Sequence, residues 1–220
     1  MALDSVDPGR NAAFSDRILV ACALRRETDS LRKHLTGCLD FLTTGVGCRR
    51  TRKILTRRFQ RGPLPAALIF TGTAGQLDPS CPMGTVLCPE TWLMDENQQI
   101  GQASRQLLEH LRSAGWDLGG IGVTVSLPVW FSSSRLRLFK RTGASLCDME
   151  AAAALQVAAQ FGVPALAPKV ISDTGDTSFM HFYRNLAKNL EALAAYLQQL
   201  LKDLVTILPS DGCNRLELAD

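Results

Sequence analysis

Residues 147–176 read CDMEAAAALQVAAQFGVPALAPKVISDTGD, and this stretch decides most of what the sequence predicts. Its alanine-rich part, residues 151–161, predicts a helix because alanine has the highest helix propensity. The apolar run at residues 165–172 predicts a buried strand. An Asp-Met-Glu triplet precedes the helix and an aspartate ends the strand, so acidic side chains stand at both ends of this helix–strand unit.

The rest of the chain repeats this alternation of apolar strands and amphipathic helices. Further strands are predicted at residues 17–23, 41–44, 66–71, 85–89 and 121–126. Further helices are predicted at residues 27–35, 48–59 and 103–114, and a long one from residue 183 onward carries leucines at steps of three and four. We therefore predict an α/β fold, a single domain over residues 17–208 with a central mixed β-sheet flanked by helices. The ends, residues 1–16 and 209–220, are predicted to be flexible tails.

The bulk composition is that of an ordinary globular protein. The 220 residues carry a net charge of +3, which is too small to indicate a nucleic acid as partner. Residues 1–16 hold acids and lack the apolar core of a signal peptide, and no apolar run reaches the roughly 18 residues of a membrane-spanning helix. The seven cysteines include no Cys-x-x-Cys pair, so we expect buried thiols in a cytoplasmic protein and no metal site.

Polar and acidic residues follow several of the predicted strands. Glu27 comes after the first strand, TGTAG (71–75) stands at the end of the third, where GTAGQL (72–77) is predicted as a turn, and SLPVWF (126–131) follows a later one. The Asp-Met-Glu triplet at 148–150 and the Ser-Asp pair at 172–173 complete the set. Because ligands of open α/β sheets bind beyond the carboxyl ends of the strands, we expect these side chains to meet at one rim.

Each of these features also has a simpler structural interpretation. Glu27 suits the first turn of a helix, where a negative charge is stabilised by the helix dipole. Asp148 and Glu150 suit helix caps, and Asp173 suits a turn. A Gly-Thr-Ala-Gly segment alone is a weak signal, because any tight strand exit can use glycines.

The combination of segments is more specific than its parts. In order along the chain they read ACALRRETDSL (21–31), TTGVG (43–47), FTGTAGQL (70–77), VSLPVWF (125–131) and the stretch quoted first. Together they resemble the nucleoside phosphorylase/nucleosidase superfamily over about residues 17–205. Within it the resemblance is greatest to the 5′-methylthioadenosine/S-adenosylhomocysteine nucleosidases and to hopanoid-associated phosphorylase-like members, and weaker to futalosine hydrolases.

The resemblance implies two catalytic residues and a set of substrate-binding residues. Glu27 matches the acid that activates the attacking water, and Asp173 matches the acid that helps protonate N7 of the leaving purine, supported by Ser172. Glu150 matches the residue that holds the ribose hydroxyls, with Met149 beside it under the sugar. The remaining positions that the resemblance assigns to substrate binding are Thr73, Ala74, Gly75, Trp130, Phe131 and Phe179.

Among these remaining positions, Thr73 is expected to line the ribose and base pocket. Trp130 is expected to stack on the purine, Phe131 to offer backbone contacts, and Phe179 to line the pocket of the 5′-substituent. The sequence departs from the family pattern at Lys169, where an arginine is usual, and at Leu127-Pro128, which replace Gly-Asp.

The chemistry of glycosidic cleavage suits this acid set. The reaction passes through an oxocarbenium-like sugar, and a pair of carboxylic groups can protonate the leaving group and activate water. A phosphorylase would instead need an anion site, and the family's usual GDPxR loop is replaced by ACALRRE (21–27). We therefore predict hydrolysis of an adenosine-type nucleoside, without a cofactor, by a homodimer as the resemblance implies.

Two alternatives stay open. A phosphorylase of a purine nucleoside or of a hopanoid-linked nucleoside has the same fold, and Arg25 and Arg26 could serve its phosphate. A non-catalytic nucleoside-binding protein could also keep the fold, although the intact acids at positions 27, 150 and 173 argue against it.

One basic segment takes no part in this prediction. Residues 49–61 contain seven cations and no acid: Arg49, Arg50, Arg52, Lys53, Arg57, Arg58 and Arg61. A solvated helix face is the simpler interpretation, and contact with an anionic surface such as lipid headgroups is the less favoured one.

Overall fold

The computed structural model describes residues 17–94, 100–175 and 179–208, with side chains described in these ranges except for residues 179–184. The predicted tails, residues 1–16 and 209–220, lie outside this description. The strands are β1 (Ile18–Cys22), β2 (Leu39–Thr43), β3 (Ala67–Gln76), β4 (Val86–Leu87), β5 (Thr91–Met94), β6 (Ile100–Gln102), β7 (Ile121–Thr124), β8 (Leu146–Asp148), β9 (Ala165–Leu166) and β10 (Lys169–Asp173). The helices are α1 (Arg25–His34), α2 (Cys48–Arg61), α3 (Arg105–Ser113), α4 (Ser132–Thr142), α5 (Ala151–Gln160) and α6 (Phe179–Val205).

The strands form one mixed sheet, as the sequence predicts. Its main order is β2-β1-β3-β8-β7-β5-β6, with β10 and β9 also paired to β3 and with β4 paired to β10. Strands β1, β2 and β3 pair in parallel, whereas β3–β8, β4–β10 and β5–β6 are antiparallel. Strand β3 is the central member, because it pairs with β1 up to Thr71 and with β10 from Gly72 onward.

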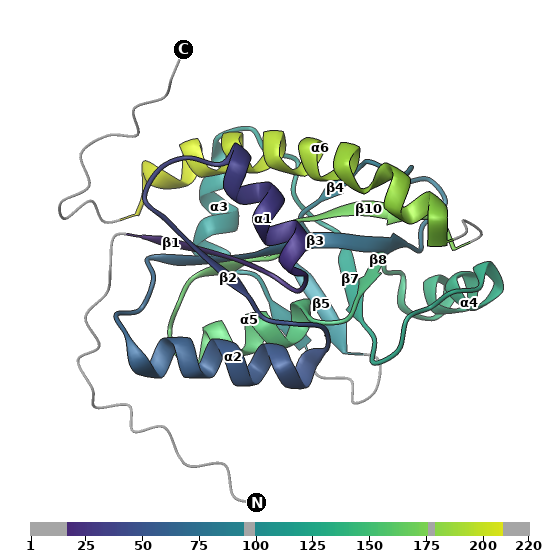
Figure 1. Cartoon of the computed structure of the whole chain (residues 1–220), viewed down its shortest axis with the longest axis horizontal. Helices are drawn as coiled ribbons and strands as arrows, with labels where there is room; N and C mark the ends of the chain where they lie inside the picture. Colours follow the sequence, from purple (N-terminus) through teal and green to yellow (C-terminus); the bar gives the residue numbers. More distant parts are fainter. Residues whose placement is uncertain (1–16, 95–99, 176–178, 209–220) are drawn as a thin grey trace, which may run out of the picture.

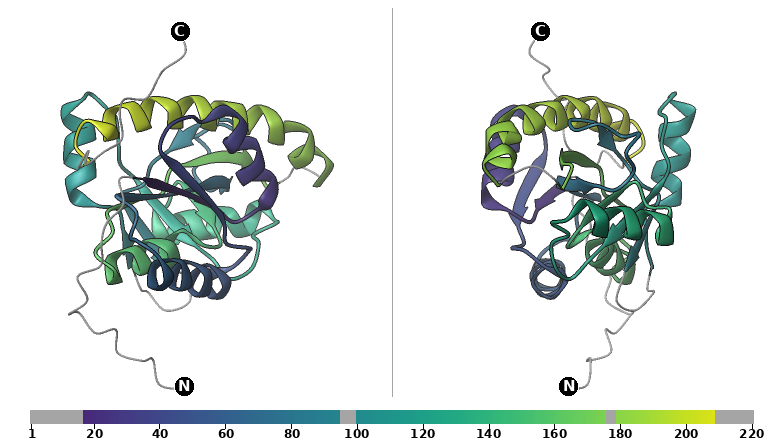
Figure 2. Two further views of the ribbon diagram at one scale, coloured as in Figure 1. Left: turned by 60° about the vertical axis from the view of Figure 1, so that its left-hand side comes forward. Right: turned by 90° about the vertical axis from the view of Figure 1, so that its right-hand side faces the viewer.

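Helices cover both faces of the sheet. Figure 1 shows α6 along the top of the molecule and α2 with α5 along the bottom, with the sheet between them. Figure 2 shows the same layers from two further directions. The side chains of β1 alternate between these layers: Ile18, Val20 and Cys22 pack with α1, α3 and α6, and Leu19 and Ala21 pack with α2 and α5. Burial on both faces explains why this strand is apolar throughout.

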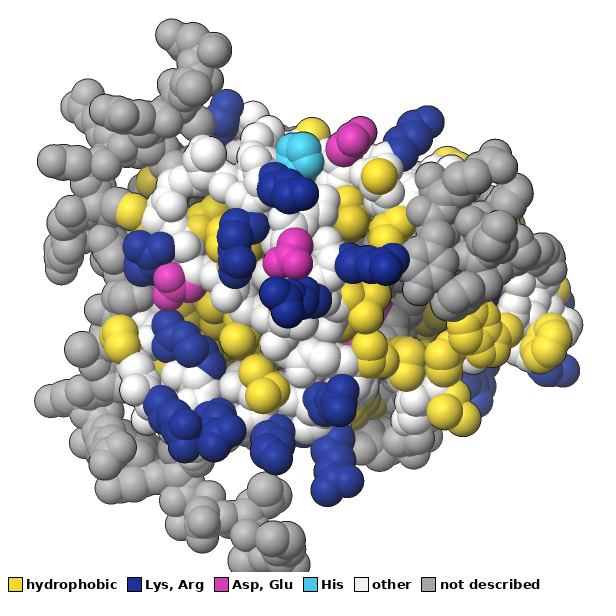
Figure 3. Space-filling view, viewed as in Figure 1, with side chains coloured by type: hydrophobic (Ala, Val, Ile, Leu, Met, Phe, Trp, Pro, Cys, Tyr) yellow, Lys and Arg dark blue, Asp and Glu magenta, His cyan; other side chains and the backbone are white. Residues whose placement is uncertain are grey.

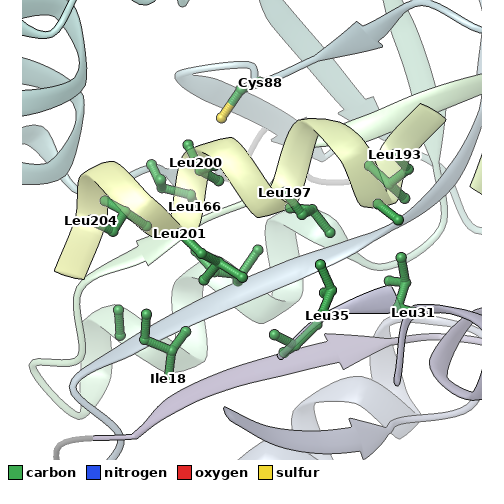
Figure 4. Packing of buried hydrophobic residues seen from close by; sticks show 14 of the residues in the cluster. Ile18, Leu31, Leu35, Cys88, Leu166, Leu193, Leu197, Leu200, Leu201 and Leu204 are labelled. Carbon is green, nitrogen blue, oxygen red and sulfur yellow. The ribbon is translucent and has the colours of Figure 1, made fainter. Parts of the chain in front are cut away.

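The predicted long amphipathic helix is confirmed as α6, and its leucines form the largest part of one core. Figure 4 shows Leu193, Leu197 and Leu204 of this helix beside Leu31 of α1 and Ile18 of β1. Burial of each leucine contributes about 1.5–3 kcal/mol relative to an exposed position. The stripe therefore fixes α6 across the sheet, where Val170 of β10 belongs to the same core.

Two boundaries differ from the sequence-based expectation. The segment GTAGQL (72–77), predicted as a turn, continues strand β3 to Gln76, because β10 replaces β1 as its pairing partner at Gly72 and keeps the backbone hydrogen-bonded. The strand predicted at 165–172 is two strands, β9 and β10, with Pro168 between them. Proline lacks the N–H that a ladder requires, so the interruption follows from its chemistry.

Several short elements had no clear signal in the sequence. Strands β5, β6 and β8 have only three or four residues each, too few for a periodic pattern. Helix α4 begins with three serines and lies at the right-hand end of the molecule in Figure 1, where β3 and β10 point. Among the cysteines, Cys22, Cys88 and Cys147 are buried free thiols as expected, whereas Cys38 is disulfide-bonded. Within the described ranges, none of the helices is both long and apolar enough to cross a membrane.

Candidate active site

A pocket of about 350 Å³ opens at the carboxyl ends of the central strands. It is lined by nine of the eleven residues that the sequence singles out, which are Glu27, Thr73, Ala74, Gly75, Trp130, Met149, Glu150, Ser172 and Asp173. Their segments lie far apart in the chain, from α1 to the end of β10, and the fold brings them to one rim as expected for an open α/β sheet.

Two predicted residues are not among those that line the pocket. Phe131 is the N-cap residue of α4, and its side chain is 73% exposed. Its proposed contact was through the backbone, so the position of the side chain leaves that prediction untested. Phe179 begins α6, but its side chain lies outside the described residues.

Glu27 is buried and combines a structural contact with a place in the pocket. One carboxylate oxygen accepts hydrogen bonds from the backbone N–H and the hydroxyl of Thr73, both at 2.8 Å. The other accepts from the N–H of Leu24 at 3.1 Å, the N-cap residue of α1. The helix-start interpretation is therefore correct, and the same side chain also lines the cavity.

Gly72 makes room for this carboxylate. A Cβ atom at position 72 would lie 2.8 Å from Oε1 of Glu27, and the backbone there has a φ of +136°, which disfavours residues with side chains. The Gly-Thr pair at 72–73 thus admits the acid and then binds it. The close approach of Glu27 explains why glycine stands at position 72, and the sequence alone does not reveal this contact.

Asp148 caps the alanine-rich helix α5, which leaves Glu150 free to face the pocket. The carboxylate of Asp148 accepts hydrogen bonds from the backbone N–H groups of Glu150 and Ala151 and from the hydroxyl of Thr124. Its Oδ2 also lies 3.2 Å from the ammonium of Lys169, and both side chains are only 2% exposed. Of the two acids considered as caps, only Asp148 performs that role.

Glu150 reaches across the pocket to the loop between β2 and α2. Its Oε1 accepts a hydrogen bond of 2.7 Å from the backbone N–H of Gly47, and its side chain makes no cap bond to α5. Burial, followed by the neighbouring carboxylate of Asp148, raises the pKa of Glu150 from 4.5 to about 7. Lys169 and the Gly47 N–H act in the opposite direction.

We call the carboxylates of Asp148, Glu150 and Glu27 the inner acid cluster. Among the described residues that line the pocket, Lys169 is the cation that acts on all three, and it is almost completely buried. Burial alone would lower the pKa of Lys169, but the carboxylates of Asp148, Glu150 and Glu27 together raise it above the usual value. The ammonium therefore stays charged and partly offsets three acids. In the sequence it was visible only as a departure from the arginine that the family pattern usually has there.

Asp173 ends β10 and pairs with Arg135 of α4, a residue that sequence reasoning missed. Nη2 of Arg135 donates to Oδ1 of Asp173, and the hydroxyl of Ser172 donates to Oδ2 at 3.2 Å. The Ser172 hydroxyl also lies 3.1 Å from the carbonyl oxygen of Ala74. Both oxygens of the acid are thus oriented by donors.

Arg135 also connects three segments around the pocket. Its guanidinium donates to the carbonyls of Val129 at 2.7 Å, Gln76 at 3.3 Å and Asp173 at 2.9 Å. These bonds and the ion pair use four of its five N–H groups. A Cβ at Gly75 or Gly175 would lie within 3.0 Å of the Arg135 side chain, so this close packing requires glycines.

The remaining wall of the pocket is apolar. Its members are Ala23, Leu24, Val46, Val125, Pro128, Val129, Trp130, Cys147 and Met149. The lining therefore combines acids and their donors with apolar groups, which suits a ligand with a polar sugar and a flat or apolar remainder. Within the described ranges, no three His, Cys, Asp or Glu side chains are grouped so as to hold a metal ion.

The family model described as the phosphorylase superfamily matches residues 41–202, about three quarters of the chain. The chain belongs to the phosphorylase superfamily. The matched region includes Asp148, Glu150 and Asp173, whereas Glu27 lies before it. No curated protein sequence matches the chain significantly.

Solved structures share this fold at low sequence identity. Futalosine hydrolase of Helicobacter pylori aligns with a TM-score of 0.72 at 18% identity, over 86% of this chain and 98% of that chain. A 5′-methylthioadenosine/S-adenosylhomocysteine nucleosidase of Campylobacter jejuni gives 0.71 at 17%, over 86% and 99%. The Helicobacter pylori enzyme of that name, as an Asp-to-Asn mutant with 5′-methylthioadenosine in its active site, gives 0.74 at 16%, over 86% and 100%. The nucleoside phosphorylase-like fold predicted from the sequence is therefore confirmed.

Proposed function

We propose that this protein is a nucleosidase that hydrolyses the N-glycosidic bond of an adenosine-type purine nucleoside to the free base and the sugar. The observation that carries the proposal is the convergence of Glu27, Glu150 and Asp173 on one pocket, each oriented by a donor from a distant segment. The solved structures that share the fold include nucleosidases acting on such bonds, and one of them holds 5′-methylthioadenosine.

In this proposal the inner acid cluster binds the sugar. Glu150 accepts hydrogen bonds from the ribose hydroxyls, and Met149 packs beneath the ring. Asp148, Glu150 and Glu27 surround a single ammonium, that of Lys169, so the cluster is electronegative when its acids are ionised. A positive charge that develops on the sugar in the transition state is stabilised more strongly there than the neutral substrate.

The leaving base is handled at the other end of the pocket. The purine stacks on Trp130, and Asp173 as a carboxylic acid donates its proton to N7 as the glycosidic bond breaks, which leaves its carboxylate beside Arg135. The proton of the attacking water passes to Glu27. Arg135 and Ser172 hold the carboxylate in position for this contact. Protonation of the base makes it a better leaving group, and general acid–base help of this kind typically contributes about 10²–10⁴-fold to the rate.

The nucleophile in this proposal is water next to Glu27. A phosphate dianion would need cations that are not already neutralised. Among the described residues that line the pocket, the cations are Lys169 and Arg135, and each is paired with an aspartate. Arg25 is 87% exposed and pairs with Asp29, so it supports no phosphate site in the cavity. These observations favour hydrolysis over phosphorolysis.

The test is to incubate the protein with 5′-methylthioadenosine, adenosine and inosine, each with and without phosphate, and to quantify the free base. We expect adenine release at a rate that phosphate does not change. Glu27→Gln should abolish the release, whereas the matched control Asp29→Asn, on the exposed side of the same helix, should leave it unchanged.

Each other outcome rejects a defined part of the proposal. Phosphate acceleration with accumulation of ribose 1-phosphate would establish a phosphorylase. A strong preference for inosine would exclude an adenosine-type substrate. Binding without any base release would indicate a nucleoside-binding protein. The cytoplasmic location is inferred from the cysteine pattern and the homodimer from the resemblance, and light scattering of the purified protein tests the homodimer.

A further inference from the structure

Large apolar side chains project into solvent around the mouth of the pocket. Leu127 is 77% exposed, Phe131 73% and Trp130 57%, all in the segment between β7 and α4. Leu136 of α4 and Val46 of the loop before α2 are 43% and 44% exposed. Trp130 and Val46 also line the cavity, so these apolar residues and the opening belong to one surface. We call these five residues the apolar rim.

The apolar rim is unusual because its members are not scattered. In Figure 3, apolar side chains gather in a band on the right of the view, the side on which α4 lies in Figure 1. Single exposed apolar residues are normal, but a contiguous patch of them at a functional opening indicates a surface that something covers.

Cations lie beside the apolar rim. Helix α2 exposes Arg49, Arg50, Lys53, Arg57 and Arg61, and no acid occurs between Cys48 and Arg61. None of these five has a carboxylate within ion-pair distance in the described part of the chain, whereas Arg58 of the same helix pairs with Asp40. Figure 3 shows the basic side chains along the bottom of the same face, where α2 lies.

Arg50 joins the two regions. Its Cδ lies 3.1 Å from the position of a Cβ on Gly45, which places the side chain against the loop that carries Val46. The charged helix thus begins where the apolar rim ends. Helix α4 adds the exposed cations Arg137 and Lys140 on the other side of the rim.

We propose that this face, the apolar rim together with the exposed cations of α2, docks onto an anionic lipid bilayer. Protruding apolar side chains such as Leu127, Phe131 and Leu136, flanked by Lys and Arg, are the pattern of segments that insert into the headgroup layer, and Trp130 lies where the apolar rim meets the pocket. Anionic lipids supply the negative charge that α2 lacks in its own surroundings. A second copy of the chain fits the face less well, because its own α2 carries the same cations and supplies no acid to complement them.

Docking in this way turns the mouth of the pocket toward the membrane surface. The proposal requires no particular reaction in the pocket. It is therefore independent of the proposed hydrolysis, and each can fail without the other.

The experiment is co-sedimentation of the intact protein with phosphatidylcholine vesicles, with and without roughly a quarter of phosphatidylglycerol. We expect binding to the anionic vesicles only, weakening as salt is raised. Each basic residue near the bilayer contributes about fivefold to partitioning, so Lys53→Gln/Arg57→Gln/Arg61→Gln should weaken it by roughly 100-fold. A matched control removes three exposed cations from the opposite layer, Lys33→Gln/Arg105→Gln/Lys202→Gln, and should bind as the unchanged protein does.

A second variant, Leu127→Ser/Leu136→Ser, tests the apolar part of the face. It should also lose vesicle binding while keeping its activity toward a soluble nucleoside, because neither side chain lines the pocket. The proposal is overturned if anionic vesicles do not bind the protein, or if the α2 variant and its control bind equally. It is also overturned if the Leu127→Ser/Leu136→Ser change converts a dimer into a monomer without altering vesicle binding.

Discussion

Glu150→Gln should make the ligand-free protein more stable at neutral pH while destroying its proposed activity. The side chain is 5% exposed, and burial next to Asp148 raises its pKa from 4.5 to about 7. Ionising Glu150 in the folded protein is therefore unfavourable. Glutamine keeps an oxygen to accept the Gly47 N–H and has almost the same shape, so the substitution removes the charge and little else.

The magnitude follows from the pKa difference. One pKa unit corresponds to 1.36 kcal/mol, so a rise from 4.5 to about 7 corresponds to about 3 kcal/mol. The sign is set by linkage: a carboxyl whose folded pKa is raised binds its proton more tightly when folded, so stability falls as the pH rises from 4.5 through about 7 and then levels. The Glu150→Gln variant has no carboxyl group at this position, so its stability does not fall for this reason over that pH range.

Urea unfolding of both proteins across this pH range measures the effect. The difference in unfolding free energy between the two proteins should be small near pH 4.5 and should approach about 3 kcal/mol in favour of the variant above pH 7. Calorimetry should show that the variant binds a nucleoside far more weakly than the wild type and binds free adenine equally well. Parallel stability curves, or equal losses for nucleoside and adenine, would refute the reasoning.

Three further substitutions test the other parts of the site. Asp173→Asn should fold normally but release base about 10²–10⁴-fold more slowly, and near-normal turnover of the folded variant would remove this acid from the mechanism. Arg135→Ala should lower kcat and also destabilise the protein by about 3–5 kcal/mol, because it leaves the partly buried Asp173 without its charged partner and several carbonyls without a donor; unchanged unfolding would show that the ion pair is unimportant. Gly72→Ala should be more destabilising than Gly115→Ala by about 1–3 kcal/mol, since both have a positive φ but only the former has the Glu27 carboxylate within 3 Å; equal losses in thermal unfolding would exclude the steric argument.

Helices and strands that carry a clear apolar pattern of their own could be predicted from the sequence. The leucine stripe of α6 and the apolar run of β1 predict both their type and their burial, because each is long enough to show a period or a continuous core. The acids of the site were found for a different reason, since the order of short segments along the chain resembles one family.

The contacts that position those acids could not be predicted in the same way. Arg135 lies 38 residues before Asp173, on a helix with a weak apolar pattern, and nothing in the sequence around it indicates that its side chain is buried. The continuation of β3 through Gly72 depends on a change of partner from β1 to β10, which is a property of the sheet rather than of the segment. The two roles of Glu27 were weighed as alternatives, but its two carboxylate oxygens allow both at once.

The change of partner along β3 also bears on how the protein reaches its active form. The first part of the strand pairs with the N-terminal strand β1 and with β9, and the last part pairs with β10 and β8. Strands β8, β9 and β10 come about 70–100 residues later in the sequence than the parts of β3 they pair with. Each acid is bound by a donor from another segment: Glu27 by Thr73, Glu150 by Gly47 and Asp173 by Arg135. Non-local pairings of this kind form slowly, because the loops between them must close first. The pocket therefore cannot exist in a partly folded chain that has made only its N-terminal strands, and recovery of catalysis during refolding should trail the recovery of helix content.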